Sequence, residues 1–161
     1  KLMSLEKKEQ RVIRTGTRAM ALEREKTYRL FIEEIPEPRK DPQQGAQISV
    51  AIRFGVPVFV RPLQQNLKGE IERAELSGGD VKVRVKNTGN VHFAINTVNV
   101  GAGNFLKETK GWYLLAGAAR EYSVPIPTEV CTSAAQLEVS IKADPLELKR
   151  VIDIDKSKCT P

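Results

Sequence analysis

Apolar and polar residues alternate with a period of two along most of this chain, which is the pattern of half-buried β-strands. The longest alternating segment covers residues 48–60, in which every second residue from Ile48 to Val60 is apolar. At about 3.3 Å per residue, a strand of that length would span roughly 40 Å. A shorter segment precedes it, in which Tyr28, Leu30 and Ile32 share one face. The first part of the chain is therefore predicted to hold at least two strands.

The rest of the chain contains shorter alternating segments that are separated by turn signals. Strands are predicted at residues 71–76, 81–85, 91–100 (with a change of phase), 111–115, 121–124, 137–143 and 150–154. The Ser-Gly-Gly-Asp sequence at residues 77–80 predicts a tight turn. The alternation changes parity between Ile95 and Val98, which predicts a bulge or a bend. About seven strands in about a hundred residues, joined by short turns, are typical of an antiparallel Ig-like β-sandwich.

A boundary is predicted near Arg61 and Pro62, because a proline ends ladder pairing and the polar residues after it suit a hinge. The fold class is all-β. Residues 62–161 are predicted to form a C-terminal Ig-like domain. Residues 1–61 have too few strands to close a sandwich, so we expect them to be the last part of an N-terminal Ig-like domain whose early strands are missing.

The formal net charge of +6 does not indicate nucleic-acid binding, because Lys and Arg are interleaved with Glu and Asp along the chain. No basic cluster carries the aromatic residues on which single-stranded bases stack. The chain also lacks an apolar run of about 18 residues, so we expect no membrane insertion. Residues 1–10 are charged and polar, so no secretory leader is expected there.

The residues that carry most enzyme chemistry are scarce. His92 is the single histidine, and a lone histidine in a strand is usually a surface residue or one with satisfied hydrogen bonds. We therefore expect no enzyme activity, no metal and no cofactor. Cys131 and Cys159 have no partners at zinc-like spacing. They are either buried free thiols or a disulfide that ties the C-terminal tail to its domain, and export from the cytoplasm would favour the disulfide.

The order of several motifs resembles one family of secreted β-proteins. Residues 28–36 form a predicted strand that ends in Glu-Ile-Pro, and residues 48–62 form one that ends in Phe-Val-Arg-Pro. Residues 12–16 resemble the strand before both, and residues 85–91 resemble the strand-turn-strand after the hinge. In this order the chain resembles the PapD-like periplasmic chaperones of pilus assembly by the chaperone–usher route.

The resemblance implies two Ig-like domains that hold an incomplete pilus subunit and deliver it to an outer-membrane usher in the periplasm. In such chaperones the last strand of the first domain fills the gap in the subunit by β-augmentation. Carried over by position, the donor side chains are Ile48, Val50 and Ile52, with Ala46 and Phe54 as extensions. The alternative is that these residues fill the protein's own core, in a structural or adhesive Ig-like protein without chaperone activity.

One departure from the family pattern concerns the subunit's terminal carboxylate. Many members bind it through a lysine shortly before the Arg-Pro sequence, but Pro57 stands at the matching position here. The surrounding sequence resembles the divergent, archaic branch of the family. We expect Arg29, in the neighbouring strand, to be the anchor, and a solvated strand arginine is the alternative. The open edge of the first part could also support self-association.

Overall fold

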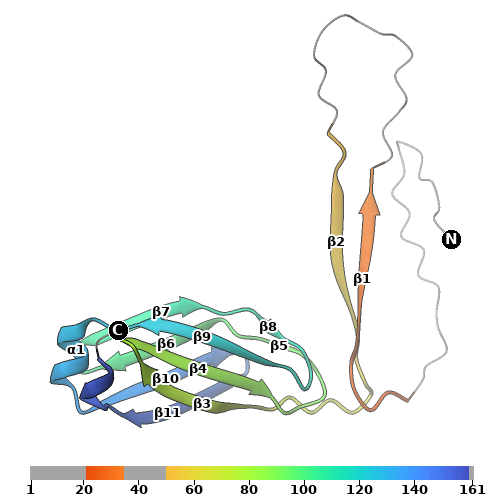
Figure 1. The fold of residues 1–161 in the computed structure, drawn as a ribbon. Coiled ribbons are helices and arrows are strands. Elements are labelled where there is room, and N and C mark those ends of the chain that lie inside the picture. The colour runs from red at the N-terminus through yellow and green to blue at the C-terminus, as the bar shows by residue number, and fades with distance from the viewer. Residues whose placement is uncertain (1–20, 35–49, 160–161) are drawn as a thin grey trace, which may run out of the picture.

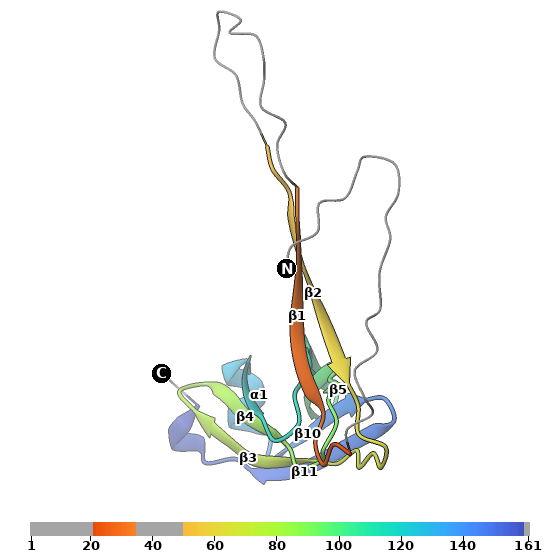
Figure 2. The same ribbon diagram turned by 90° about the vertical axis from the view of Figure 1, so that its right-hand side faces the viewer.

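The computed structural model describes residues 21–34 and 50–159, which form a β-sandwich and a long two-stranded hairpin. The hairpin stands on one end of the sandwich and projects steeply away from it (Figures 1 and 2). It consists of β1 (Lys26–Glu33) and β2 (Arg53–Val60), which pair antiparallel without a register shift.

The sandwich is built from antiparallel sheets. A four-stranded sheet has the order β11-β10-β6-β7, and a three-stranded sheet has the order β3-β4-β9. A short ladder, β5-β8, lies at the end nearest the hairpin (Figure 1). The strands of the sandwich are β3 (Gly69–Ser77), β4 (Asp80–Asn87), β5 (Phe93–Ala94), β6 (Thr97–Ala102), β7 (Phe105–Lys110), β8 (Tyr113–Leu114), β9 (Ala119–Pro125), β10 (Gln136–Ala143) and β11 (Leu146–Asp153).

The core lies between these sheets and is mainly aliphatic. Alternate residues of β4, β6 and β10 point inward, as the period of two predicts, and are completely buried. Burying one such valine or leucine side chain stabilises the fold by about 1.5–3 kcal/mol. The fully buried residues include Val81, Val83, Val85, Val98, Val100, Val124, Leu137, Val139 and Ile141. The chain thus forms the predicted all-β, Ig-like sandwich.

The change of parity between Ile95 and Val98 is a bend. Phe93 pairs with Leu114 in β5-β8, and Thr97 pairs with Lys110 in β6-β7. The same register therefore continues from the first pair of strands to the second, and no extra residue is inserted at the break. Gly111 lies where the two strands come together, because a Cβ on it would be 2.2 Å from the carbonyl oxygen of Ile95. The bend turns both halves of the strand toward the same core.

Several boundaries differ from the sequence prediction. The long strand predicted from residue 48 begins only at Arg53, although Ile52 still accepts a backbone hydrogen bond from Glu34 (2.9 Å). β11 begins at Leu146 rather than at residue 150. β7 was not predicted, because this edge strand alternates too weakly, and neither was the short helix α1 (Thr128–Ser133).

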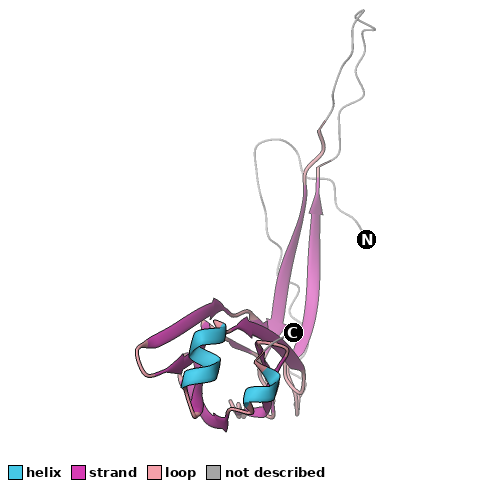
Figure 3. Cartoon of the chain, turned by 60° about the vertical axis from the view of Figure 1, so that its left-hand side comes forward, coloured by secondary structure: helices cyan, strands magenta, loops and turns pink. Residues whose placement is uncertain are grey.

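Cys131 and Cys159 form a disulfide at the end of the sandwich far from the hairpin. Their Cα atoms are 5.6 Å apart, and both residues are buried. The bond joins α1 to the residue that follows a short 3-10 helix, η1 (Lys156–Lys158); the two helices lie side by side in Figure 3. It therefore holds the C-terminal segment against the core.

Replacing both cysteines, by Cys131→Ala with Cys159→Ala, should lower the free energy of unfolding by about 3–4 kcal/mol, because the bond closes a loop with a sequence separation of 28. Urea denaturation would measure this. A reducing agent should destabilise the unsubstituted chain similarly and leave the double variant unchanged. Equal stability of the two chains would show that the bond adds nothing.

Candidate functional site

The two faces of the β1-β2 hairpin differ in chemistry. Because cross-strand partners share a face, the register assigns each side chain to one side. One side, here called the apolar face, consists of Tyr28, Leu30, Ile32, Phe54, Val56 and Val58. Each of these side chains is between 40% and 59% exposed. A continuous exposed apolar surface of this kind is typical of an interaction site.

The predicted donor residues lie at the far end of this hairpin. Phe54 is part of the apolar face, and Ile52 continues the same parity and is 49% exposed. Val50 is 75% exposed and precedes the strand. Ile48 and Ala46 lie outside the described residues. The structure thus exposes three of these side chains to solvent, Phe54 on β2 and Val50 and Ile52 just before it.

The opposite side, here called the mixed face, carries the predicted anchor. Arg29 lies opposite Pro57 and forms no ion pair with another residue that the structure describes. Arg53 places its guanidinium 4.3 Å from the centre of the Phe31 ring, a cation–π contact. A Cβ on Gly55 would lie 3.3 Å from Phe31 and 3.5 Å from Cδ of Arg29. Arg29 and the donor residues Ile52 and Phe54 are therefore on opposite faces.

A buried carboxylate joins the base of the hairpin to the sandwich. The side chain of Glu25, just before β1, is 1% exposed, and its two oxygens lie 2.7 and 2.8 Å from Nδ1 of His92. Because a carboxylate only accepts, Nδ1 of His92 donates in this contact. The guanidinium of Arg61, just after β2, lies 3.8 Å from the same carboxylate. The His92 ring also stacks on Phe59 of β2, with ring centres 3.8 Å apart.

The loop that carries His92 also clamps the chain on both sides of the hairpin. The Asn90 side chain donates to the carbonyl oxygens of Glu23 (3.0 Å) and Gln64 (2.9 Å), and it accepts from the amide of Asn66 (2.6 Å). Asn87 is fully buried, and its amide nitrogen donates to two backbone carbonyls within the sandwich. These contacts and the Glu25–His92 pair form what we call the joint. They fix the root of the hairpin to the sandwich.

Sequence reasoning recognised only part of the joint. His92 was expected to be a surface or satisfied residue, and its hydrogen bond to Glu25 satisfies it. Glu25 was missed, because it lies in a polar stretch that shows no periodicity. No local signal could have found it, since its burial depends on a loop 67 positions away.

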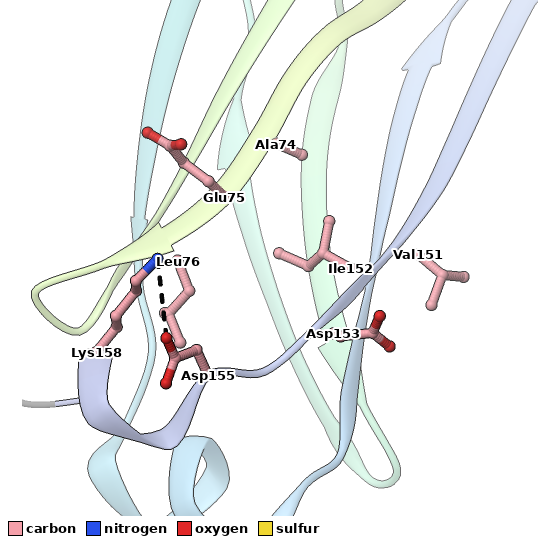
Figure 4. Close-up of a pocket in the computed structure, with 8 residues that line it drawn as sticks. All are labelled: Ala74, Glu75, Leu76, Val151, Ile152, Asp153, Asp155 and Lys158. Carbon is pink, nitrogen blue, oxygen red and sulfur yellow. Dashed lines mark ion pairs between the residues drawn. The ribbon is translucent and has the colours of Figure 1, made fainter.

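Elsewhere on the described part of the sandwich, a surface pocket lies between β3 and β11 (Figure 4). Its polar lining includes Glu75, Asp153 and Asp155, and Lys158 lies 3.9 Å from Asp155. Hydrogen bonds from Ser157 lower the pKa of Asp155. Within residues 21–34 and 50–159, no group of three or more acidic, histidine or cysteine side chains could hold a metal ion. No helix in the same part of the chain is long and apolar enough to span a membrane.

His92→Ala should lower the free energy of unfolding by about 1–3 kcal/mol, because the buried Glu25 carboxylate then loses its nearest donor. His92→Asn keeps a donor but loses the stacking on Phe59, so its loss should be smaller. Denaturant unfolding would rank the variants, and limited proteolysis of residues 61–68 would report the opening of the joint. If His92→Ala were as stable and as resistant as the original chain, the joint would not depend on this pair.

Comparison with known protein families gives a match that includes the hairpin. Residues 1–66 match a family model described as pili and flagellar-assembly chaperone, PapD N-terminal domain. This match contains the described hairpin together with Glu25 and Arg61. Neither the curated proteins nor the solved structures provide a match. Residues 1–66 are thus similar to the N-terminal domain of the PapD-like pilus-assembly chaperones.

Proposed function

We propose that this chain is a periplasmic chaperone that stabilises incomplete Ig-like pilus subunits by donor-strand complementation. It then delivers the subunits to an outer-membrane usher for fibre assembly. In this role it is a binding protein and catalyses no reaction. The family of residues 1–66 supports the general assignment, and the geometry of the hairpin supports the mode of binding.

The observation that carries this proposal is the exposed apolar hairpin. An isolated two-stranded hairpin is at best marginally stable in water. Its apolar side chains and unpaired strand edges require a partner that supplies both packing and hydrogen bonds. A subunit that lacks its final strand has the complementary defect, namely an open apolar groove with unpaired edges. Mutual addition of strands satisfies both molecules.

The donor side chains have enough apolar surface for stable capture. Burying an isoleucine, valine or phenylalanine side chain contributes roughly 1.5–3 kcal/mol, before the cost of ordering the complex is subtracted. Val50, Ile52 and Phe54 are all exposed and ready to be buried, and Ile48 is the proposed fourth donor. Side chains of one parity also fix the register, because a slip of one residue would turn them away from the groove.

We further propose that the boundary between two Ig-like domains lies near Pro62. Residues 61–68 contain no strand and connect β2 to β3. The joint holds this connection through Arg61, Gln64 and Asn66. A firmly held hairpin loses less conformational freedom when it binds, which favours capture.

The double substitution Val50→Asp with Ile52→Asp should reduce capture of a subunit at least about 100-fold, because two carboxylates would be buried without partners. The measurement is co-purification of the full chain with a fimbrial subunit lacking its last strand, both expressed in the periplasm.

Leu106→Asp is the matched control, since Leu106 is an exposed apolar residue (69%) on the sandwich edge strand β7. It should capture the subunit as well as the original chain does. If the double variant also captured normally while remaining folded, donor-strand complementation would be wrong, and a structural or adhesive Ig-like protein would be the better description.

We propose Arg29 as the anchor for the terminal carboxylate of the subunit. It lies directly across from Pro57, so its side chain is on the same face as a lysine at position 57 would be. A guanidinium can form two parallel hydrogen bonds to one carboxylate. Arg29 forms no ion pair with another residue in the described part of the chain, so its guanidinium is available to bind the carboxylate.

Arg29→Ala should weaken binding of a subunit with a free C-terminus by about 10-fold or more, since a charge-assisted hydrogen bond contributes about 1.5–3 kcal/mol. Extending the subunit by two glycines should cause a similar loss, and combining both changes should add little. Binding measured by calorimetry tests this cycle. Additive losses would mean that Arg29 and the terminus do not interact. This result would not depend on whether donor-strand complementation is correct.

A further inference from the structure

One hydrogen bond determines which backbone groups of β2 face its free edge. The amide of Glu34 donates to the carbonyl oxygen of Ile52. In an antiparallel pair, residues that exchange hydrogen bonds alternate with residues whose N–H and C=O point outward. In the observed register the even-numbered residues of β2 therefore bond to β1. Arg53, Gly55 and Pro57 direct their backbone groups to the free edge.

Pro57 interrupts that edge. It has no N–H, so the row of outward donors stops after Gly55. The position is consistent with the ladder, because a proline is tolerated in a strand where its nitrogen faces away from the neighbouring strand. The next outward residue is Phe59, whose side chain packs against His92 and Tyr113 of the sandwich. The open part of the edge thus ends at Gly55.

Positive charge lies beside this end of the edge. The stem of Arg29 crosses from β1 to β2, because its Cδ lies 3.5 Å from where a Cβ of Gly55 would be. Arg53 lies on the same face, but Glu33 is 4.0 Å from it and offsets its charge. Arg29 has no such acidic neighbour among the described residues. Two copies of this edge would bring two such arginines together, so the charge favours a partner with a carboxylate over a second copy.

We propose that Pro57 is a ladder stop: a strand of the captured subunit pairs with Ala51, just before β2, and with Arg53 and Gly55 of β2, and it cannot pair beyond. This inference rests on the proposed function, and it adds which residues set the register of the partner strand. A strand shifted further toward the sandwich would place a carbonyl opposite Pro57 without a donor. The loss of one ladder hydrogen bond weakens binding about fivefold.

Amide hydrogen exchange on the full chain, alone and bound to a fimbrial subunit that lacks its last strand, tests the proposal. Exchange at Arg53 and Gly55 should slow on binding, whereas exchange at Phe59 should not change. Pro57→Ala restores the missing donor, so it should extend protection to the substituted position and to Phe59 and tighten binding about fivefold. Ala51→Pro removes one outward donor and should weaken binding about fivefold. Protection of the Glu34 amide confirms that each variant keeps its hairpin.

The outcomes separate this inference from the proposed function. Capture with protection through Phe59 in the unsubstituted chain would overturn the ladder stop and leave the chaperone function standing. Unchanged binding and protection in Pro57→Ala would overturn it as well. A folded chain that captures no subunit would contradict the proposed function, and the ladder stop would fall with it.

Discussion

Apolar side chains and backbone hydrogen-bonding groups both require partners, and a two-stranded sheet cannot supply them from within. The β1-β2 hairpin exposes an apolar face of six side chains and two strand edges within the described part of the chain. The sandwich also has edge strands, but it buries alternate side chains of its strands between two sheets. Only the hairpin, among the described elements, combines open edges with a face of exposed apolar side chains along its whole length, and this contrast supports the proposal that the hairpin is the binding element.

The sandwich contributes to binding by holding the hairpin at its root. Glu25 is buried against His92, Phe59 stacks on the same ring, and Asn90 bonds to the chain before and after the hairpin. Leaving a buried carboxylate without its hydrogen-bond donor is costly, and this cost favours the intact joint. The disulfide at the opposite end secures the C-terminal segment and leaves the joint untouched.

In the proposed complex, the two faces of the hairpin would provide two kinds of recognition. The apolar face and the donor residues offer packing, while Arg29 and Arg53 on the mixed face offer charge. Because Pro57 offers no cation, the proposed anchor is Arg29 on the neighbouring strand. Its stem passes close to Gly55, where a Cβ would lie 3.5 Å from Cδ of Arg29.

The sequence by itself determined the fold class, most of the strands and the hairpin, because a period of two records which side chains meet a core. It also indicated the family, through the order of its short motifs, and it placed Phe54 and Arg29 on their strands. It could not locate β7 or α1, whose patterns are too short and too polar.

Only the tertiary structure decided the joint and the edge. Glu25 and His92 are 67 positions apart, and nothing in either local sequence requires their contact. The pairing of Arg29 with Pro57 depends on the register between two strands, which alternation alone leaves open by steps of two residues. The physical reason is the same in both cases: local pattern fixes which way a side chain points, and long-range packing fixes what it meets.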